Sequence, residues 1–428
     1  AKDHRYAFFP SVSAAWRISE ENFWQPLKGW WNDMKIRGSY GSLGNQVMDD
    51  LGNFPYLATY GTNSSYNYLI NGSKPVIVKA PGLVAPDFTW ETVTQMDFGF
   101  DASFLNNRLT GTFDWYRRNT KDMLVAGATL PATLGASVPK SNSADMKTIG
   151  WELSLGWNDR LENGFSYWVK GVLSDYQATI TKYAGNDAGF YSQSDGDGKY
   201  YVGQKIGEIW GYHSTGLFQS DDEAATIDQS ELYAGKWGAG DVKYEDLDND
   251  GKITKGEETI YNPGDKSIIG NKTPRYQFGI TVGFDYKNFD FEMFWQGTGK
   301  RDYMLSGAQF WGFTSQWDVP YTPALDYWTE TNTDAYFPRP GWQNGGNRVT
   351  SDRYLQSAAY GRLKNLTVGY TIPKNLTTKW GISRLRLYVT GENLLTITPL
   401  NDAFDPETLG GMTYPINRKV AIGLNLTL

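Results

Sequence analysis

The chain has 428 residues, a formal net charge of −7 and no cysteine, which excludes disulfide bonds and every site that depends on a thiolate. The acidic balance, without clusters of Lys and Arg, also argues against nucleic acid as a partner. Its 17 Trp and 28 Tyr are many, and such amphipathic rings are favoured both at membrane interfaces and in sugar-binding clefts.

The hydropathy of the sequence excludes a transmembrane helix but leaves a membrane β-barrel open. No run of about 18 apolar residues is present. Barrel strands alternate lipid-facing apolar residues with polar residues that face the lumen, so their mean hydropathy stays low. The first ten residues lack the pattern of a signal peptide, and we therefore expect that Ala1 is not the native start of the precursor.

Alternation of apolar and polar residues predicts eleven strands. It is clearest at the end of the chain, where every second residue from Val420 to Leu428 is Val, Ile or Leu. Two tight turns, at Asn106–Asn107 and at Lys287–Asn288, join neighbouring strands into hairpins. In chain order the predicted strands are 5–19, 33–43, 88–104, 108–125, 146–158, 164–182, 273–286, 289–303, 358–372, 383–397 and 416–428.

Short and long connections alternate strictly between these strands, which is typical of an outer-membrane barrel with periplasmic turns and extracellular loops. Soluble sandwiches and propellers have no reason to put every long loop at one end, although surface β-solenoids sometimes do. We therefore predict an all-β fold, an antiparallel transmembrane β-barrel. The long connections, which we expect to be extracellular, are 44–87, 126–145, 183–272, 304–357 and 398–415.

The strand count predicts that the barrel is incomplete. Single-chain bacterial barrels usually have an even number of strands, and a 22-stranded barrel with a plugged lumen is the architecture of active transporters. Residues 1–428 then form strands twelve to twenty-two, the C-terminal half of the barrel. The plug and the first strands would lie upstream, and the two edge strands would pair with the rest of the same barrel.

Charged residues on the strands predict which face of the sheet contacts water rather than lipid. A charge at the middle of the bilayer is costly, so it faces the lumen while its neighbours along the strand face outer-membrane lipid. The predicted lumen set is Asp285, Glu292, Arg384, Arg386 and Glu392, and the predicted lipid set is Phe284, Phe291, Leu385 and Leu387.

Several stretches spread over nearly the whole chain resemble the SusC/RagA family of TonB-dependent outer-membrane transporters of Bacteroidetes. FFPSVSAAWRIS (8–19) and MKIRGSYGSLGNQ (34–46) are similar to the mid-barrel hairpin of the family. GDVKYEDLDNDGKIT (240–254) and the following 268–302 resemble its long acidic loop and next hairpin. The closing strands are matched by YGRLKNLTVGYTIPK (360–374), LRLYVTGENLLTIT (385–398) and the DPE after them.

The resemblance implies an integral protein of the bacterial outer membrane that imports oligomeric nutrients, usually glycans and sometimes peptides. It implies a SusD-like surface lipoprotein as a lid and TonB as the source of energy, through an N-terminal part that this chain does not include. One departure is the final Leu428, because outer-membrane barrels commonly end in an aromatic residue. A soluble or surface carbohydrate-binding or hydrolytic β protein is the alternative, and detergent dependence would distinguish the two.

An acidic run in the connection 183–272 has the spacing of a calcium loop of the EF-hand type. The side chains of Asp246, Asp248 and Asp250, the carbonyl of Lys252, a water near Thr254 and a bidentate Glu257 would supply the ligands. The flanks carry Gly and Pro rather than helical patterns, which excludes a helix-loop-helix switch. We therefore expect a structural Ca²⁺ in an extracellular loop. An acidic solvated turn without an ion is the alternative.

Other candidate sites are weaker. His4 and His213 are far apart in the sequence, and a catalytic triad is not supported, so we expect structural roles for both. Asp114, Glu152 and Glu392 fall on strand positions that face the lumen, and the protein is not predicted to be an enzyme. Loop aromatics could stack on substrate, contact a lid protein or pack within the loops, and these are Phe310, Trp311, Trp317, Tyr321, Trp328 and Trp342.

Overall fold

The computed structural model describes residues 6–45, 57–63, 69–70, 72–74, 76–79, 81–85, 88–126, 131, 133, 138–184, 186, 189, 200–409 and 414–428. His4 and parts of the predicted loop 44–87, chiefly 46–56 and 64–68, lie outside these residues. The described residues contain no helix long and apolar enough to cross a membrane.

Eleven strands form one antiparallel sheet, in the order β1-β2-β5-β6-β7-β8-β13-β14-β17-β18-β19. All eleven predicted strands are confirmed. Their bounds are Ser11–Arg17, Trp31–Asn45, Glu91–Phe104, Leu109–Ala126, Lys140–Arg160, Ser166–Tyr183, Arg275–Tyr286, Phe289–Lys300, Tyr360–Thr371, Arg384–Ile397 and Lys419–Thr427. The largest differences are at the starts of β1 and β7. The first strand begins at Ser11 rather than at 5, and β7 begins at Lys140 rather than at 146 because its pairing with β6 continues beyond a register shift near Thr120.

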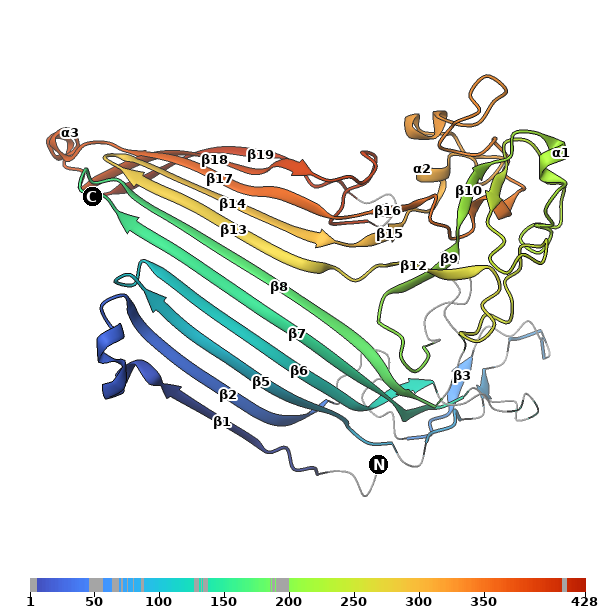
Figure 1. The fold of residues 1–428 in the computed structure, drawn as a ribbon, viewed down its shortest axis with the longest axis horizontal. Coiled ribbons are helices and arrows are strands. Elements are labelled where there is room, and N and C mark those ends of the chain that lie inside the picture. The colour runs from blue at the N-terminus through green and yellow to red at the C-terminus, as the bar shows by residue number, and fades with distance from the viewer. Residues whose placement is uncertain are drawn as a thin grey trace.

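The sheet is curved and open, with neighbouring strands tilted side by side (Figure 1). In the part of the chain that the structure describes, β1 and β19 are its two edges, so these residues do not close a barrel. Short turns join the strands at one end, and the long connections gather at the other (Figure 1). The prediction of an antiparallel, barrel-type sheet is therefore confirmed, with long and short connections at opposite ends.

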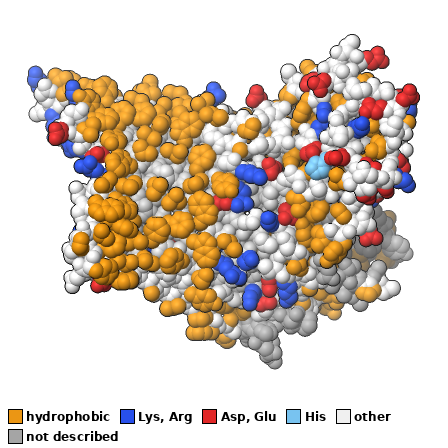
Figure 2. Space-filling model, viewed as in Figure 1, with side chains coloured by type: hydrophobic (Ala, Val, Ile, Leu, Met, Phe, Trp, Pro, Cys, Tyr) orange, Lys and Arg blue, Asp and Glu red, His pale blue; other side chains and the backbone are white. Residues whose placement is uncertain are grey.

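The strands are longer than a bilayer requires. A tilted strand crosses the hydrocarbon core in about 9–11 residues, whereas β7 has 21 and both β6 and β8 have 18. Hydrophobic side chains cover the sheet on its turn-proximal part, and charged side chains become common nearer the long connections (Figure 2). The apolar belt is the part of each strand that we expect to lie in lipid, and the strands continue beyond it.

Alternation divides the sheet into two faces as predicted. Phe291, Val368, Val389 and Ile422 are paired partners across four strands and form one apolar row. Phe284 stacks on Phe291 with ring centroids 5.0 Å apart, so it shares this face. Arg386 lies on the opposite face, where its Nε donates to Asp290 Oδ1 at 2.8 Å. The predicted lumen and lipid sets thus lie on opposite faces of the sheet.

Two ion pairs on the charged face span an intervening strand. Arg37 of β2 pairs with Asp114 of β6, with Nη2 2.7 Å from Oδ2, and Gly99 of β5 is the backbone partner of both residues. Asp290 of β14 and Arg386 of β18 also meet over Gly369 of β17, which is the backbone partner of Asp290, while Arg386 reaches it diagonally from beside Thr371. Strands two apart in a sheet are separated by about 9.5 Å, so the ion pairs need a strand without a side chain between them.

We expect Gly99→Ala to destabilise the folded sheet. A Cβ at position 99 would meet Asp114 Oδ1 and the guanidinium of Arg37. Forcing an extra methyl group into a packed site costs about 1–3 kcal/mol. Urea unfolding of the full-length gene product in lipid vesicles would measure the loss. Gly171→Ala is the matched control, because a Cβ there meets no heavy atom within 4 Å. Equal unfolding midpoints for the two variants would contradict the prediction.

The larger hydrophobic core lies among the long connections, and a smaller cluster of Ala144, Ile180 and Tyr183 lies on β7 and β8. Tyr244, Ile253, Phe310 and Tyr354 are fully buried in one cluster that joins the connections after β8, β14 and β18. We call this unit the loop body, residues 200–272, 302–358 and 398–409. Its elements are β9 (Glu208–Tyr212), β10 (Ser214–Leu217), α1 (Asp221–Ala224), β11 (Val242–Tyr244), β12 (Lys266–Asn271), β15 (Asp302–Met304), α2 (Ala308–Trp311), η4 (Thr322–Leu325), η5 (Gly345–Arg348) and β16 (Leu355–Ser357).

The remaining elements are short. The connection between β2 and β5 contains β3 (Gly61–Asn63) and β4 (Ile77–Lys79), which pair with each other. At the turn end are η1 (Ile18–Glu20), η2 (Asn22–Leu27), α3 (Lys374–Thr377) and η6 (Thr378–Trp380).

Candidate functional site

The acidic run in the loop body folds into a tight turn around Asp246. Its Oδ1 accepts a hydrogen bond from the backbone N–H of Asn249 at 2.6 Å, and its Oδ2 accepts one from Gly251 at 2.7 Å. Asn249 and Gly251 have φ of +61° and +84°, a left-handed conformation that Gly and Asn adopt at least cost. The sequence DLDNDG thus specifies the turn locally.

Three carboxylates converge at this turn. Ligand atoms of Asp246, Asp248 and Asp265 lie within 4.8 Å of one another. Asp265 is fully buried, and its two oxygens accept hydrogen bonds from the backbone N–H groups of Leu247 and Thr254, each at 2.7 Å. The buried carboxylate therefore fastens both sides of the acidic turn. Asp265 was not among the residues that the sequence predicted.

The electrostatics of the cluster are unbalanced. Burial opposes ionisation of Asp246, but the N–H groups of Gly251, Asn249 and Asp250 outweigh it and lower the pKa of its carboxyl. Partial loss of hydration in the turn and the neighbouring carboxylate of Asp250 raise the pKa of Asp248. Carboxylates that repel one another in this way are stabilised by a cation, and oxygen ligands are those that Ca²⁺ and Mg²⁺ take.

The other predicted ligands are placed differently. Asp250 and Glu257 lie outside the cluster of three carboxylates. Asp250 Oδ1 accepts a hydrogen bond from the N–H of Lys252 at 2.8 Å. Glu257 is exposed on a further turn, where its backbone N–H donates to Asn262 O at 3.0 Å. The chain turns at Gly256 and Gly264, with φ of +58° and +59°, and this brings Asp265 back to the acidic run, whereas an EF-hand would continue as a helix.

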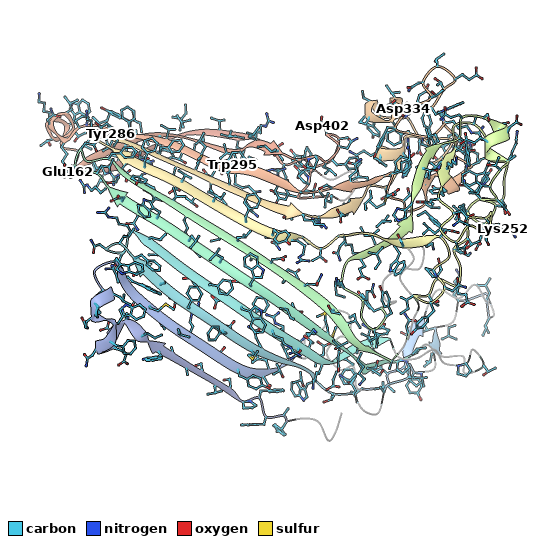
Figure 3. The ribbon with its side chains drawn as sticks, in the orientation of Figure 1. Glu162, Lys252, Tyr286, Trp295, Asp334 and Asp402 are labelled. Carbon is cyan, nitrogen blue, oxygen red and sulfur yellow. The ribbon has the colours of Figure 1, made fainter. Side chains whose placement is uncertain are left out.

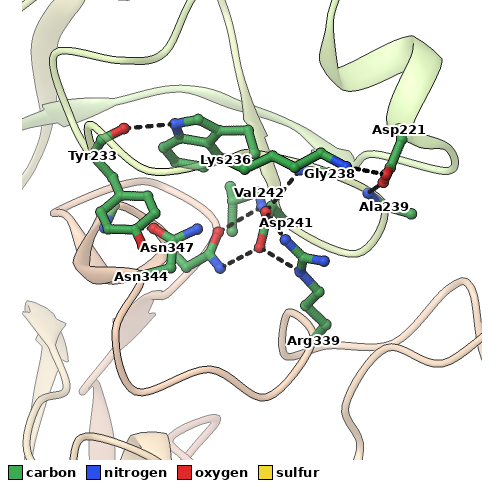
Figure 4. Close-up of polar contacts among 12 residues, drawn as sticks. Asp221, Tyr233, Lys236, Gly238, Ala239, Asp241, Val242, Arg339, Asn344 and Asn347 are labelled. Atoms are coloured by element: carbon green, nitrogen blue, oxygen red, sulfur yellow. Dashed lines mark hydrogen bonds and ion pairs between the residues drawn. The ribbon is translucent and has the colours of Figure 1, made fainter.

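Asp241 is a second buried carboxylate, and it joins two connections of the loop body (Figure 4). Its Oδ1 accepts from Arg339 Nε at 3.0 Å and from Asn347 Nδ2 at 2.8 Å. Its Oδ2 accepts from Arg339 Nη2 at 2.7 Å and from the N–H of Gly238 at 2.9 Å. Asn347 in turn accepts from the N–H of Val242 at 2.8 Å. The long connections after β8 and β14 are thereby held together by a fully satisfied carboxylate.

Asp241→Ala is expected to separate these two connections. It leaves the partly exposed guanidinium of Arg339 and the buried amide of Asn347 without their acceptor, and an unsatisfied buried polar group costs about 1–3 kcal/mol. Limited proteolysis of the full-length gene product in lipid should cut within 205–272 and 304–357 faster, with the strands intact. Asp334→Ala, an exposed Asp of the connection after β14, is the control (Figure 3). Unchanged cutting of the Asp241→Ala variant would show that the carboxylate does not fasten the loops.

His213 joins three segments of the loop body. Its Nδ1 lies 2.8 Å from Asp352 Oδ2, and its Nε2 lies 2.7 Å from Ser267 Oγ. Because an ionised carboxylate only accepts, Nδ1 donates to Asp352, while Nε2 shares a hydrogen bond with the Ser267 hydroxyl, which can donate or accept. The order of groups is that of a Ser-His-Asp triad, which the sequence could not indicate because 139 residues separate His213 from Asp352.

The loop aromatics divide into a buried and an exposed set. Phe310 and Trp311 lie in the core with 0% and 8% exposure, so their rings pack in the loop body and offer no free face to a substrate. Trp328 packs against the same core. Trp317, Tyr321 and Trp342 are 83%, 43% and 47% exposed. Prediction from sequence could not separate these sets, because aromatic residues are equally suited to loop cores and to sugar stacking.

Comparison with known proteins gives the class. The chain belongs to the TonB-dependent receptor-like β-barrel family, whose model matches residues 1–394. Members of this family are integral β-barrels of the bacterial outer membrane. Within the family the chain is of the SusC/RagA type: it is 26% identical over its whole length to the TonB-dependent receptor SusC of Bacteroides thetaiotaomicron.

Other relatives and solved structures agree. TonB-dependent receptor P3 of Formosa agariphila is 30% identical over 466 aligned residues, which cover 100% of this chain and 42% of the relative. The structure of the RagAB peptide transporter matches with a TM-score of 0.76 and 22% identity, over 99% of this chain and 44% of that one, which shows the fold. The chain thus spans about two fifths of the length of these relatives.

Proposed function

We propose that the chain is the C-terminal half of the barrel of an outer-membrane importer that takes up oligomeric nutrients with energy from TonB. The observation that carries the proposal is the open sheet of eleven strands, apolar on one face and charged on the other, within the TonB-dependent receptor family. In this proposal the edge strands β1 and β19 pair with the other half of the barrel, because unpaired backbone groups are not tolerated in lipid. The loop body lies outside the cell.

The partners and cargo follow from the same proposal. A SusD-like lipoprotein would cover the loop body, and TonB would act through the N-terminal part of the full-length protein. We propose oligosaccharide as the cargo, because Trp317, Tyr321 and Trp342 expose rings that could stack on sugars. Peptide is the alternative cargo, and the structurally similar RagAB is described as a peptide transporter. The proposed protein is a transporter and not an enzyme.

Growth and uptake by cells that lack the gene would test the transport function. Cells complemented with the full-length gene should accumulate a fluorescent oligosaccharide, and cells without TonB should not. A pool of fluorescent peptides of similar size would be tested in parallel as the second candidate cargo. Accumulation of neither cargo, with the protein present in the outer membrane, would contradict import. Recovery of the full-length protein in the soluble fraction without detergent would instead support the alternative of a soluble carbohydrate-binding or hydrolytic protein.

We also propose that the cluster of Asp246, Asp248 and Asp265 holds one Ca²⁺. Ca²⁺ takes six to eight oxygen ligands. Part of this set would come from the three carboxylates, the carbonyl of Lys252 and a water near Thr254. Mg²⁺ fits less well, because it requires a nearly ideal octahedral geometry. In this proposal Asp265 takes the place of Asp250 and Glu257 of the sequence-based ligand set, because both lie outside the cluster. Ile253, which lies between Lys252 and Thr254, is fully buried, and its N–H donates to Asp228 O at 2.7 Å. An ion held by the neighbouring residues would therefore stabilise the packing of the loop body.

Metal analysis would test the calcium proposal. The full-length protein should carry one calcium after dialysis against micromolar calcium, and chelator should speed proteolysis of 200–272. Asp248→Asn should weaken the binding by about 10-fold or more, about 1.4 kcal/mol, without unfolding the loop, because Asp248 is exposed and accepts only one weak backbone hydrogen bond, at 3.2 Å. Asp222→Asn, an exposed Asp on α1, should bind normally. Protein without metal whose digestion ignores chelator would refute the site.

A further inference from the structure

Basic side chains lie on the outward face of the sheet, where the strands leave the apolar belt. Figure 2 shows Lys and Arg side chains just beyond the belt on this face. Strand pairing brings three basic residues together on neighbouring segments. Arg117 is on β6, Lys147 is on β7, and Lys205 is on the segment that follows β8. Thr179 of β8 pairs with both Lys147 and Lys205. We call Arg117, Lys147 and Lys205 the outer cations.

The alternation of side chains places the outer cations on the face that we expect to contact lipid. Arg117 is three residues from Asp114 of the charged face, so its side chain points to the opposite face. Arg117 pairs with Ile149, and Lys147 is two residues from Ile149 along β7. Residues that pair across strands, and residues two apart in a strand, share a face. Lys205 faces the same way as Lys147, because both pair with one residue of β8.

The outer cations lie at the outer boundary of the hydrocarbon. Near the turn end of β7, Nε1 of Trp157 donates to the hydroxyl of Tyr167 at 3.2 Å, and these amphipathic rings mark the other boundary. Lys147 lies ten residues from Trp157 along β7. A tilted strand crosses the hydrocarbon in about 9–11 residues, so Lys147 lies at the level of the lipid headgroups. A Lys or Arg is tolerated at that level, whereas it is costly at the midplane.

The charge of the outer cations is not balanced by carboxylates. Within the described residues none of the three makes an ion pair, and Nε of Arg117 donates to Asn119 Oδ1 at 3.4 Å. The acidic residues on this face at the same end of β7 and β8 have other partners. Asp145 accepts from a backbone N–H of β6 at 3.0 Å, and Asp175 pairs with Arg275. Neighbouring strands are about 4.7–4.9 Å apart, so the three cations repel one another, and a bound anion offsets the repulsion.

An apolar groove on the same face leads to Arg117. It has a volume of about 590 Å³. Its lining includes Ala14, Gly38, Tyr40, Met96, Phe98 and Trp115. Ala14 of β1 pairs with Gly38 of β2, and these two small residues form its floor. Met96 is the backbone partner of Arg117, so the groove ends at a cation. An apolar groove with a cation at its end suits a molecule that has an apolar chain and an anionic head.

We propose that this face binds one phosphorylated lipid of the outer leaflet. The outer cations donate hydrogen bonds to the phosphate oxygens, and one acyl chain lies in the groove. A phosphate monoester carries about −1.5 to −2 charges at pH 7, and basic residues at a membrane surface bind such headgroups. Because the groove extends from Arg117 into the apolar belt, the occupant is a lipid and not free phosphate. The lipid is a component of the membrane and not a cargo, so the inference goes beyond the proposed import function.

Arg117→Gln and Lys147→Gln test the phosphate contacts in the full-length protein, purified in detergent. Native mass spectrometry would measure the binding of bis-phosphorylated lipid A. Each substitution should weaken the binding by about 5-fold, because one Lys or Arg contributes about 1 kcal/mol to the binding of anionic lipid. Arg118→Gln is the control and should bind as the wild type does. Arg118 is the next residue along β6 but lies on the charged face, where its Nε donates to Gln95 Oε1 at 3.1 Å.

Gly38→Leu tests the groove. A Cβ at position 38 meets nothing nearer than the carbonyl oxygen of Asp97 at 3.7 Å, so the strand keeps its place while the longer side chain fills the groove. Binding of the lipid should weaken by about 3-fold or more, because the acyl chain loses packing contacts. Gly171→Leu is the control. Gly171 pairs with Leu155 on the same face but outside the groove, and a Cβ there meets no heavy atom within 4 Å.

Equal affinities of the wild type for bis-phosphorylated and dephosphorylated lipid A would overturn the proposal. Wild-type affinity in a variant with both Arg117→Gln and Lys147→Gln would overturn it as well, and inorganic phosphate that displaces the lipid at equal concentration would overturn the assignment to a lipid. All variants should keep the heat-dependent mobility of a folded barrel in gel electrophoresis, so that a loss of binding is not a loss of fold. Uptake of cargo is measured separately, so either proposal can fail while the other stands.

Discussion

Within the hydrocarbon of a bilayer, a backbone N–H or C=O group must find its partner in the protein, because lipid offers none. An antiparallel sheet meets this demand for every residue between two neighbours, and it simultaneously fixes the direction of each side chain. Consecutive Arg386 and Leu387 therefore lie on opposite faces with no further interaction required. The apolar belt and the charged interior face are both consequences of the pairing.

Outside the bilayer the chain is held together by a buried hydrophobic core rather than by strand pairing alone. The connections after β8, β14 and β18 bury Tyr244, Phe310 and Tyr354 in a common core, as a soluble domain does. The buried carboxylates of Asp241 and Asp265 add polar contacts that fix particular segments to one another. The long connections can therefore act as one body at the end of the sheet.

This difference between the strands and the loop body explains which features of the structure could be predicted from the sequence. Strand positions and faces follow from a local period of two, and all eleven strands were predicted from it. The ligand cluster depends on distant turns, so Asp265 was missed although Asp246 and Asp248 were identified. The chain spacing also gave no sign that Ser267 and Asp352 would meet His213. The exposure of Trp317 and the burial of Phe310 were likewise decided by packing that a linear pattern does not contain.

The glycines beneath the charged pairs have a consequence for evolution. Arg37, Gly99 and Asp114 occupy one row of three adjacent strands. The residue type that each position can hold depends on the residues at the other two. A sequence that loses either charge no longer needs the glycine, and a sequence that gains a side chain at the middle position can no longer keep the pair. The three positions should therefore covary among related barrels, and this triplet, unlike a simple pair, would report contact between strands that are not neighbours.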